Sequence, residues 1–188
     1  MTGVILFRAQ PFHNGHLAQV KRAYADMQKL GSKLYIFVGS ADKYGTKRNP
    51  IPIHVRLDLI YNSLEEAFSE EDLKNIHVVA LDDLSDEANN THSWGSYLYN
   101  NVSAVTKDRD FVFYYSDKPE IVLSWFDDEA LMHIWFKFLP RADDISATIV
   151  RKCLLEFTPL DHISLENYLP PYVYSQRVKL HEYIVSAE

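Results

Sequence analysis

Cysteine is almost absent from the 188-residue sequence, which contains only Cys153. A single cysteine cannot form an internal disulfide framework or a cysteine-built zinc site. The first residues do not combine a basic flank, an apolar stretch and a small-residue cleavage site, so no signal peptide is predicted. No uninterrupted apolar run approaches the ~18 residues of a membrane span. The sequence therefore predicts a cytoplasmic protein with no membrane partner.

Positive charge is also scarce. Lys and Arg number 19 against 26 Asp and Glu, which gives a net charge of -7. Proteins that bind duplex nucleic acid usually show the opposite balance, so no nucleic-acid partner is expected. An anionic substrate would have to be held by a few placed cations. Apolar residues make up 47% and charged residues 24% of the chain, as in ordinary globular proteins, and this excludes a disordered or fibrous class.

Apolar runs and helical stretches alternate along the chain. The runs at 3–7, 34–38, 76–81, 111–115 and 133–139 are nearly continuous, as buried parallel strands are. Helical patterns cover 16–30, 93–105, 119–126 and 171–185, and further helices begin near Pro52 and Ser146. This alternation predicts an α/β protein with a doubly wound parallel sheet. The expected organisation is a single domain, 1–188, with a core at 1–157 and a C-terminal helical segment at 158–188.

The first predicted strand runs directly into Phe7-Arg8-Ala9-Gln10-Pro11-Phe12-His13-Asn14-Gly15-His16. In an open parallel sheet, ligands bind outside the carboxyl ends of the strands, where this turn belongs. A helix that begins there offers free N–H groups and partial positive charge to phosphates. His13 and His16 are three residues apart and can face the same side. Two structural histidines are the alternative, but the preceding strand, the glycine and Arg8 favour a phosphate site.

The run resembles the Gly-Arg-Phe-x-Pro-Phe-His-x-Gly-His signature of the nucleotidyltransferase superfamily, above all the archaeal-type nicotinamide mononucleotide adenylyltransferases. Gly39-Ser40-Ala41 with Arg48-Asn49-Pro50 and Arg56 is similar to that family's second motif. The segment 145–151 is similar to its late Ser-x-Thr-x-Ile/Val-Arg motif. The resemblance covers most of residues 3–156. It implies a Rossmann-like fold and adenylyl transfer from ATP, with Mg²⁺, to nicotinamide or nicotinate mononucleotide, forming a dinucleotide and pyrophosphate.

The resemblance also implies the site residues, by position in these motifs. The catalytic residues would be Arg8, His13 and His16. ATP would be bound by Phe7, Arg8, Ala9, His13, His16, Ser146, Thr148 and Arg151. The mononucleotide would be bound by Arg48, Asn49 and Trp94, with the tryptophan stacked on the nicotinamide ring.

Each of these assignments has a structural alternative. Ser146 alone would serve as a helix N-cap, Trp94 as a core residue and Arg48 as a solvated side chain. No protein metal site is expected. The acidic residues Asp82, Asp83, Asp86 and Glu87 are more simply a solvated loop than a metal loop.

Several positions depart from the family pattern, among them Ile51, Pro52 and Val55 in the second motif and two residues in the first. Phe7 stands where the family has glycine, and Ala9 stands where it has an aromatic residue or methionine. A glycine lets a nucleotide approach the backbone closely, whereas a phenylalanine ring fills space. Two arrangements are open: the ring turns into the space left at Ala9, or it covers the nucleotide cleft.

Three functions therefore remain to be compared. The first is formation of NAD from ATP and nicotinamide mononucleotide. The second is adenylyl transfer to another phosphate acceptor, such as phosphopantetheine. The third is a nucleotide or NAD sensor without turnover, which Phe7 favours and the retained phosphate-contacting residues oppose. The sequence is compatible with a homo-oligomer and does not set the oligomeric state.

Overall fold

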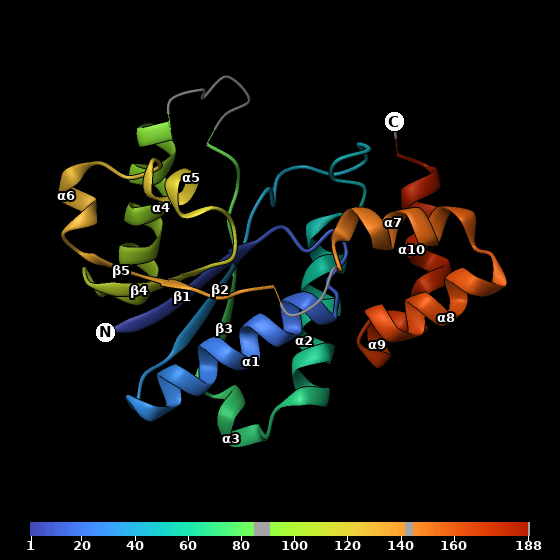
Figure 1. The fold of residues 1–188 in the computed structure, drawn as a ribbon, viewed down its shortest axis with the longest axis horizontal. Helices are drawn as coiled ribbons and strands as arrows, with labels where there is room; N and C mark the ends of the chain where they lie inside the picture. The colour runs from blue at the N-terminus through green and yellow to red at the C-terminus, as the bar shows by residue number, and fades with distance from the viewer. Residues whose placement is uncertain (85–90, 142–144, 188) are drawn as a thin grey trace.

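The computed structural model describes residues 1–84, 91–141 and 145–187, and its centre is a parallel sheet (Figure 1). The five strands lie in the order β3-β2-β1-β4-β5. Their bounds are β1 Thr2–Phe7, β2 Leu34–Val38, β3 Ile76–Ala80, β4 Phe111–Tyr115 and β5 Ile134–Phe138. All neighbouring strands pair in parallel. The strands follow the predicted apolar runs to within one residue, and the predicted α/β class is confirmed.

Helices cover both faces of the sheet (Figure 1). On one face, α1, α2 and the C-terminal helices pack over a core that includes Ile5, Ile36 and Tyr114. On the other face, α4, α5 and α6 pack over a second core around Val4, Phe37 and Phe113. The helices are α1 Asn14–Lys29, α2 Ile53–Ala67, α3 Glu70–Leu73, α4 Thr91–Thr106, α5 Pro119–Leu123, α6 Asp128–Leu131, α7 Ala147–Glu156, α8 Pro159–Tyr168, α9 Pro171–Ser175 and α10 Arg177–Val185.

The structure corrects several predicted helix boundaries. The helix predicted at 171–185 is two helices, α9 and α10, which meet at Gln176. The helix predicted at 119–126 ends at Leu123. The first helix begins at Asn14, two residues before its predicted start. Proline at its first position opens α9, and a helix of five residues is too short to show a separate helical period.

Three helices were not predicted individually. α3 and α6 have four residues each, and such short segments show no clear apolar period. α8 leaves Leu160 and Ile163 exposed, so its pattern is also weak. A local signal for α8 does exist: Thr158 and Asp161 form a reciprocal capping box at its start. The acidic loop predicted at 82–92 lies partly outside the described residues, and Asp86 and Glu87 with it.

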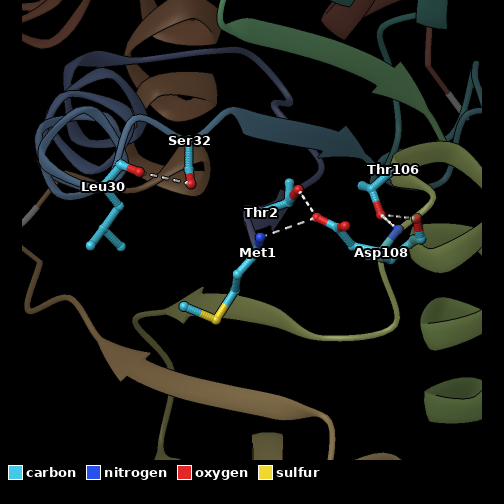
Figure 2. A network of polar contacts seen from close by, with 7 residues as sticks. Met1, Thr2, Leu30, Ser32, Thr106 and Asp108 are labelled. Atoms are coloured by element: carbon cyan, nitrogen blue, oxygen red, sulfur yellow. Dashed lines mark hydrogen bonds and ion pairs between the residues drawn. The ribbon is translucent and has the colours of Figure 1, made fainter.

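The strand order places a ligand site at one edge of the sheet. The connection after β1 leads to β2 on one side, whereas β4 joins β1 on the other. Such a reversal leaves a crevice at the carboxyl ends of the strands. At the opposite edge, where the strands begin, polar contacts join residues near the starts of β1 and β4 (Figure 2). There Asp108 accepts a hydrogen bond from the Thr2 hydroxyl and pairs with the Met1 amino group at 3.6 Å.

In the described part of the chain, no helix combines the length and the apolar character needed to span a membrane.

Candidate active site

A cleft of about 1050 Å³ opens at the carboxyl edge of the sheet. Its walls come from the β1–α1 turn, the segment after β2, the start of α4 and the start of α7. All the residues singled out from the sequence line this one cleft: Phe7, Arg8, Ala9, His13, His16, Arg48, Asn49, Trp94, Ser146, Thr148 and Arg151. The structure thus brings together side chains that are up to 144 positions apart, from Phe7 to Arg151. Their individual roles remain predictions.

The two histidines form a stack at the start of α1. Their ring centroids are 3.7 Å apart at an interplanar angle of 24°. The His16 ring also packs against two phenylalanine rings, with centroid distances of 4.6 Å to Phe7 and 5.6 Å to Phe12. Gly15 is required by this packing, because a Cβ atom there would lie 3.0 Å from the His13 ring. The glycine between the histidines therefore allows His13 to fold back over the first turn of the helix.

Burial keeps both imidazoles neutral in the free protein. Desolvation lowers the pKa of His13 to about 4, and the positive charge of Arg141 acts in the same direction. Desolvation also holds the pKa of His16 well below its ordinary value, with further lowering by His13 and Arg141. In each ring Nδ1 has no hydrogen-bond partner within the described residues. A bound anion would offset the desolvation and favour the protonated, donating form of each ring.

The two low histidine pKa values predict a pH-dependent stability. Between about pH 4 and 6.5 the unfolded chain binds more protons than the folded chain, so stability falls as the pH falls. We expect the free energy of unfolding to drop by about 1 kcal/mol per histidine from pH 7 to pH 5.5. Urea denaturation at both pH values measures this drop. His13→Gln should show a shallower dependence than the parent, and equal slopes would contradict the assignment.

Four arginines line the cleft, and three of them, Arg8, Arg48 and Arg151, form a linked group. The pKa of Arg8 is lowered by desolvation and by the nearby charge of Arg48, with Asp83 acting against both. The pKa of Arg151 is lowered by desolvation and by Arg8. The Arg151 guanidinium is fixed in place, because it donates to the Gln10 carbonyl at 2.7 Å. Cations that destabilise one another are a suitable arrangement for an anion placed between them.

Arg56 lies beneath this arginine group and is fully buried. Its guanidinium donates to the carbonyl oxygens of Arg8, Gly39 and Ser40, each at 2.8 Å. These three acceptors follow β1 and β2, so one side chain ties the carboxyl ends of both strands. Desolvation lowers the pKa of Arg56 to about 10, which leaves it charged at neutral pH. Sequence reasoning placed Arg56 in a motif without giving it a role.

The start of α7 faces the cleft with Ser146 and Thr148. Ser146 is the N-cap of α7, and its hydroxyl accepts a hydrogen bond from the Ile149 backbone N–H at 3.3 Å. Ser146 therefore caps the helix and also lines the cleft, and its predicted role in binding ATP stays a prediction. Thr148 lies near Arg151, whose guanidinium reaches the threonine hydroxyl at 3.4 Å. A helix N-terminus with two hydroxyls is well suited to bind phosphate oxygens.

The same cleft is also lined by Arg48, Asn49 and Trp94. Arg48 is exposed, whereas Asn49 is buried and its side-chain oxygen has no hydrogen-bond partner among the described residues. Trp94 is partly buried and packs against Tyr97 with ring centroids 5.7 Å apart. Gly95 permits this placement, because a Cβ atom there would lie 1.9 Å from the Trp125 carbonyl oxygen. An unpartnered amide oxygen near an aromatic ring suits a flat, polar ligand.

Phe7 and Ala9 belong to the same core cluster. The Phe7 ring is half-buried and lies 5.8 Å from the Phe12 ring and 4.6 Å from the His16 ring. Ala9 is 1% exposed and has a left-handed backbone, with φ 52°. The ring packs beside α1 and lines the cleft without filling it, since about 1050 Å³ stays open. An open cleft agrees with the first arrangement, although the ring contacts of Phe7 are with Phe12 and His16.

No site role was predicted for Gln10 or Arg141, which also line the cleft. Gln10 makes two hydrogen bonds to the Ile51 backbone, at 3.0 and 2.9 Å, and thereby joins the first motif to the second. Asp117 and Arg141 form an ion pair at 3.0 Å on the cleft wall. Neither feature has a sequence pattern of its own, because each depends on which segments meet in space.

These features are typical of a nucleotide-binding α/β protein. The sheet is parallel, its crevice lies at the carboxyl ends of the strands, and the crevice contains a histidine pair at a helix start together with several arginines. The chain belongs to the cytidylyltransferase-like family, whose model matches residues 8–153. That match contains most of the sheet and the whole set of residues predicted to form the site except Phe7.

Relatives of known name agree with this family. The chain is 25% identical over 184 residues to a nicotinamide-nucleotide adenylyltransferase of Thermococcus onnurineus, with 95% of this chain and 87% of the relative covered. It is 27% identical over 161 residues to the protein of that name from Thermococcus kodakarensis, covering 86% and 76%. The similarity to archaeal enzymes of this name, which the motifs predict, is confirmed.

Solved structures show the same fold. A bifunctional NMN adenylyltransferase/ADP ribose pyrophosphatase from Francisella tularensis superposes with a TM-score of 0.74 at 18% identity, covering 98% of this chain and 53% of that one. This chain therefore spans about half of the Francisella protein. A second structure of that protein, described as complexed with AMP and a manganese ion, gives a TM-score of 0.73 at 18% identity, covering 99% of this chain and 52% of that one.

Proposed function

We propose that this protein is an adenylyltransferase that joins ATP to nicotinamide mononucleotide, releasing pyrophosphate and forming NAD. The observation that carries this proposal is the cleft in which His13, His16, Arg8 and Arg151 meet beside the start of α7. These are the residue types that position and neutralise phosphates, and they lie where an open α/β sheet binds its ligand. The names of the relatives support the same activity.

The chemistry suits this set of side chains. A phosphate oxygen of the mononucleotide attacks the α-phosphorus of ATP, the bond to the β-phosphate oxygen breaks, and pyrophosphate leaves with the electron pair. The nucleophile is already an anion, so the protein needs no nucleophile or base of its own. Its task is to hold two anions in line and to stabilise the charge that develops between them. We assign His13 and His16 to the reacting phosphates, and Arg8 to the space between the two substrates.

The metal is proposed to enter with ATP. The residues that the structure describes contain no group of three or more His, Cys, Asp or Glu side chains suited to hold a metal ion. Mg²⁺ is commonly bound through substrate phosphates and retained waters, with one or two carboxylates at most. Asp42 and Asp83 line the cleft, and the charges of both act on Arg56. When bound, Mg²⁺ would neutralise charge on the triphosphate.

The acceptor is assigned from the part of the cleft that holds Asn49 and Trp94. The indole face offers a stacking surface for a pyridine ring. We assign Arg48 to the single phosphate of the mononucleotide, because Arg48 lines the cleft and its charge acts on Arg8. Nicotinate mononucleotide differs only in the carboxamide group and stays a candidate substrate. Phosphopantetheine has no aromatic ring to use Trp94, which makes it the weaker candidate.

Turnover assays test the proposed reaction. The protein is incubated with ATP, Mg²⁺ and one acceptor, and both pyrophosphate and the dinucleotide are measured. We expect NAD from nicotinamide mononucleotide and no product from phosphopantetheine. Tight ATP binding without any dinucleotide would contradict the proposal and identify a sensor. Omission of Mg²⁺ should lower the rate sharply.

Variants of the acceptor side provide a second test. We expect Trp94→Ala to weaken binding of nicotinamide mononucleotide roughly tenfold, because a stacked aromatic pair contributes about 1 kcal/mol beyond area burial. ATP affinity should change little. Arg48→Ala should weaken the mononucleotide but leave the nucleoside, which lacks the phosphate, unaffected. Calorimetry measures each affinity, and parental values in both variants would rule out this acceptor site.

We further propose that all 188 residues act as one nucleotidyltransferase unit, with the C-terminal helices supporting the start of α7. α7 packs on both α8 and α10, and the His181 ring bonds to the Leu154 carbonyl at 2.6 Å.

A further inference from the structure

Asp117 and Arg141 face each other at the cleft wall, where β4 and β5 end. The Leu139 N–H donates to the Tyr115 carbonyl at 2.7 Å, which extends the pairing of these strands to the edge of the cleft. Asp117 and Arg141 each follow this last pair by two residues. An Arg141 guanidinium nitrogen donates to the Asp117 carboxylate at 3.0 Å. The ion pair is thus placed by the sheet itself.

Arg141 lines the same cleft as the histidine pair. Its charge acts on His13 and His16 and helps to lower both pKa values. Arg8, by contrast, is perturbed by Arg48, and Arg151 by Arg8. The histidine pair therefore has Arg141 near it, in addition to the arginine cluster of Arg8, Arg48 and Arg151. The segment that carries Arg141 is also fixed to α1, because Arg22 donates to the Pro140 carbonyl at 3.0 Å.

The pair does not have the properties of a stability element. Both side chains are more than half exposed, at 56% for Arg141 and 59% for Asp117. Ion pairs at such exposure contribute little to folding. A guanidinium has five N–H donors, and the contact with Asp117 occupies only part of them. The remaining donors are suited to phosphate oxygens, which match the planar geometry of the group.

We propose that Arg141 is a further ligand of the nucleotide phosphates and that Asp117 positions it beside the histidines. This inference rests on the proposed function, since it requires ATP in the cleft. A triphosphate presents anionic oxygens along its length. Arg141 beside the histidines and the separate arginine cluster together offer positive charge at two places. This arrangement matches a row of phosphates better than a single cluster would.

Binding measurements on matched variants test the proposal. Calorimetry gives the affinity for ATP and for inorganic pyrophosphate, and ligand-observed NMR gives the affinity for adenosine. We expect Arg141→Gln to weaken ATP roughly 10- to 100-fold, as for a lost hydrogen bond to a charged group, with adenosine unchanged. The ATP affinity of Arg141→Lys should lie between those of the parent and Arg141→Gln. Asp117→Asn should weaken ATP binding several-fold. Lys137→Gln is the control, because Lys137 lies on β5 just before Arg141, pairs with Asp26 of α1 and does not line the cleft.

Each alternative result has a distinct meaning. Parental ATP affinity in Arg141→Gln, in a protein that still forms the dinucleotide, overturns this inference and leaves the proposed function intact. Equal losses for ATP and adenosine also overturn it, because they indicate a nucleoside contact or a distorted cleft. Parental affinity in Asp117→Asn removes the positioning role of the carboxylate. A parent protein that binds neither ATP nor pyrophosphate refutes the proposed function together with the inference.

Discussion

His16→Ala is expected to lower kcat roughly 10²- to 10³-fold, the loss typical of removing one preorganised donor to a transition state. The His16 ring is held between the His13 ring and the Phe7 ring, at 3.7 and 4.6 Å between centroids. Its position is therefore set before substrate arrives. Because its pKa is low in the free protein, it becomes a stronger donor only when phosphate charge is present. KM for ATP should change far less than kcat.

Steady-state kinetics with ATP and nicotinamide mononucleotide measure this effect, with circular dichroism and a urea midpoint to check the fold. His54→Ala is a suitable control, since His54 is exposed on α2 and does not line the cleft. A normal kcat in His16→Ala would remove His16 from the catalytic group. Equal losses in both variants would point to a general effect on the protein rather than to the site.

Phe7→Gly is the second change with a large expected effect. The Phe7 ring packs in the same core cluster as Ala9, so its removal leaves a cavity beside α1. We expect a loss of about 3 kcal/mol in the free energy of unfolding, near the low end for phenylalanine because the ring is half-buried. Phe7→Gly combined with Ala9→Phe should recover part of this loss. ATP affinity should change only modestly in either variant.

Denaturant unfolding and ATP calorimetry on the two variants distinguish the two arrangements of the ring. If Phe7 instead covers the cleft, Phe7→Gly should raise ATP affinity sharply with little loss of stability. ATP binding that appears only after this substitution would make the native protein a nucleotide sensor, and the adenylyltransferase proposal would then be withdrawn.

The sheet could be predicted from the sequence because its signal is local. Each strand is a short apolar run, and parallel strands buried on both faces need no alternation to be recognised. Most of the cleft could also be anticipated, because His13, Arg48 and Arg151 lie in motifs with a fixed order. All the predicted side chains do line one cleft. What each of them does there is a question for the experiments above.

The features that were missed depend on contacts between distant segments. Arg56 gave no sign that it would be fully buried, since its three acceptors belong to residues 16 to 48 positions away. Arg141 and Asp117 meet only because β4 and β5 are neighbours in the sheet. The C-terminal helices were partly missed for a different reason: α9 has only five residues, too few to show an apolar period of its own.

The buried Arg56 has a consequence for how the empty protein behaves. Its guanidinium lies against the Arg8 carbonyl, and the charge of Arg8 lowers the pKa of both Arg56 and Arg151. In the empty cleft these cations repel one another, and hydrogen bonds at the ends of β1 and β2 hold Arg56 in place. Any polyanion that enters relieves this repulsion, and its binding is linked to folding by mass action. We therefore expect the free energy of unfolding to be higher when substrate occupies the cleft than when the cleft is empty.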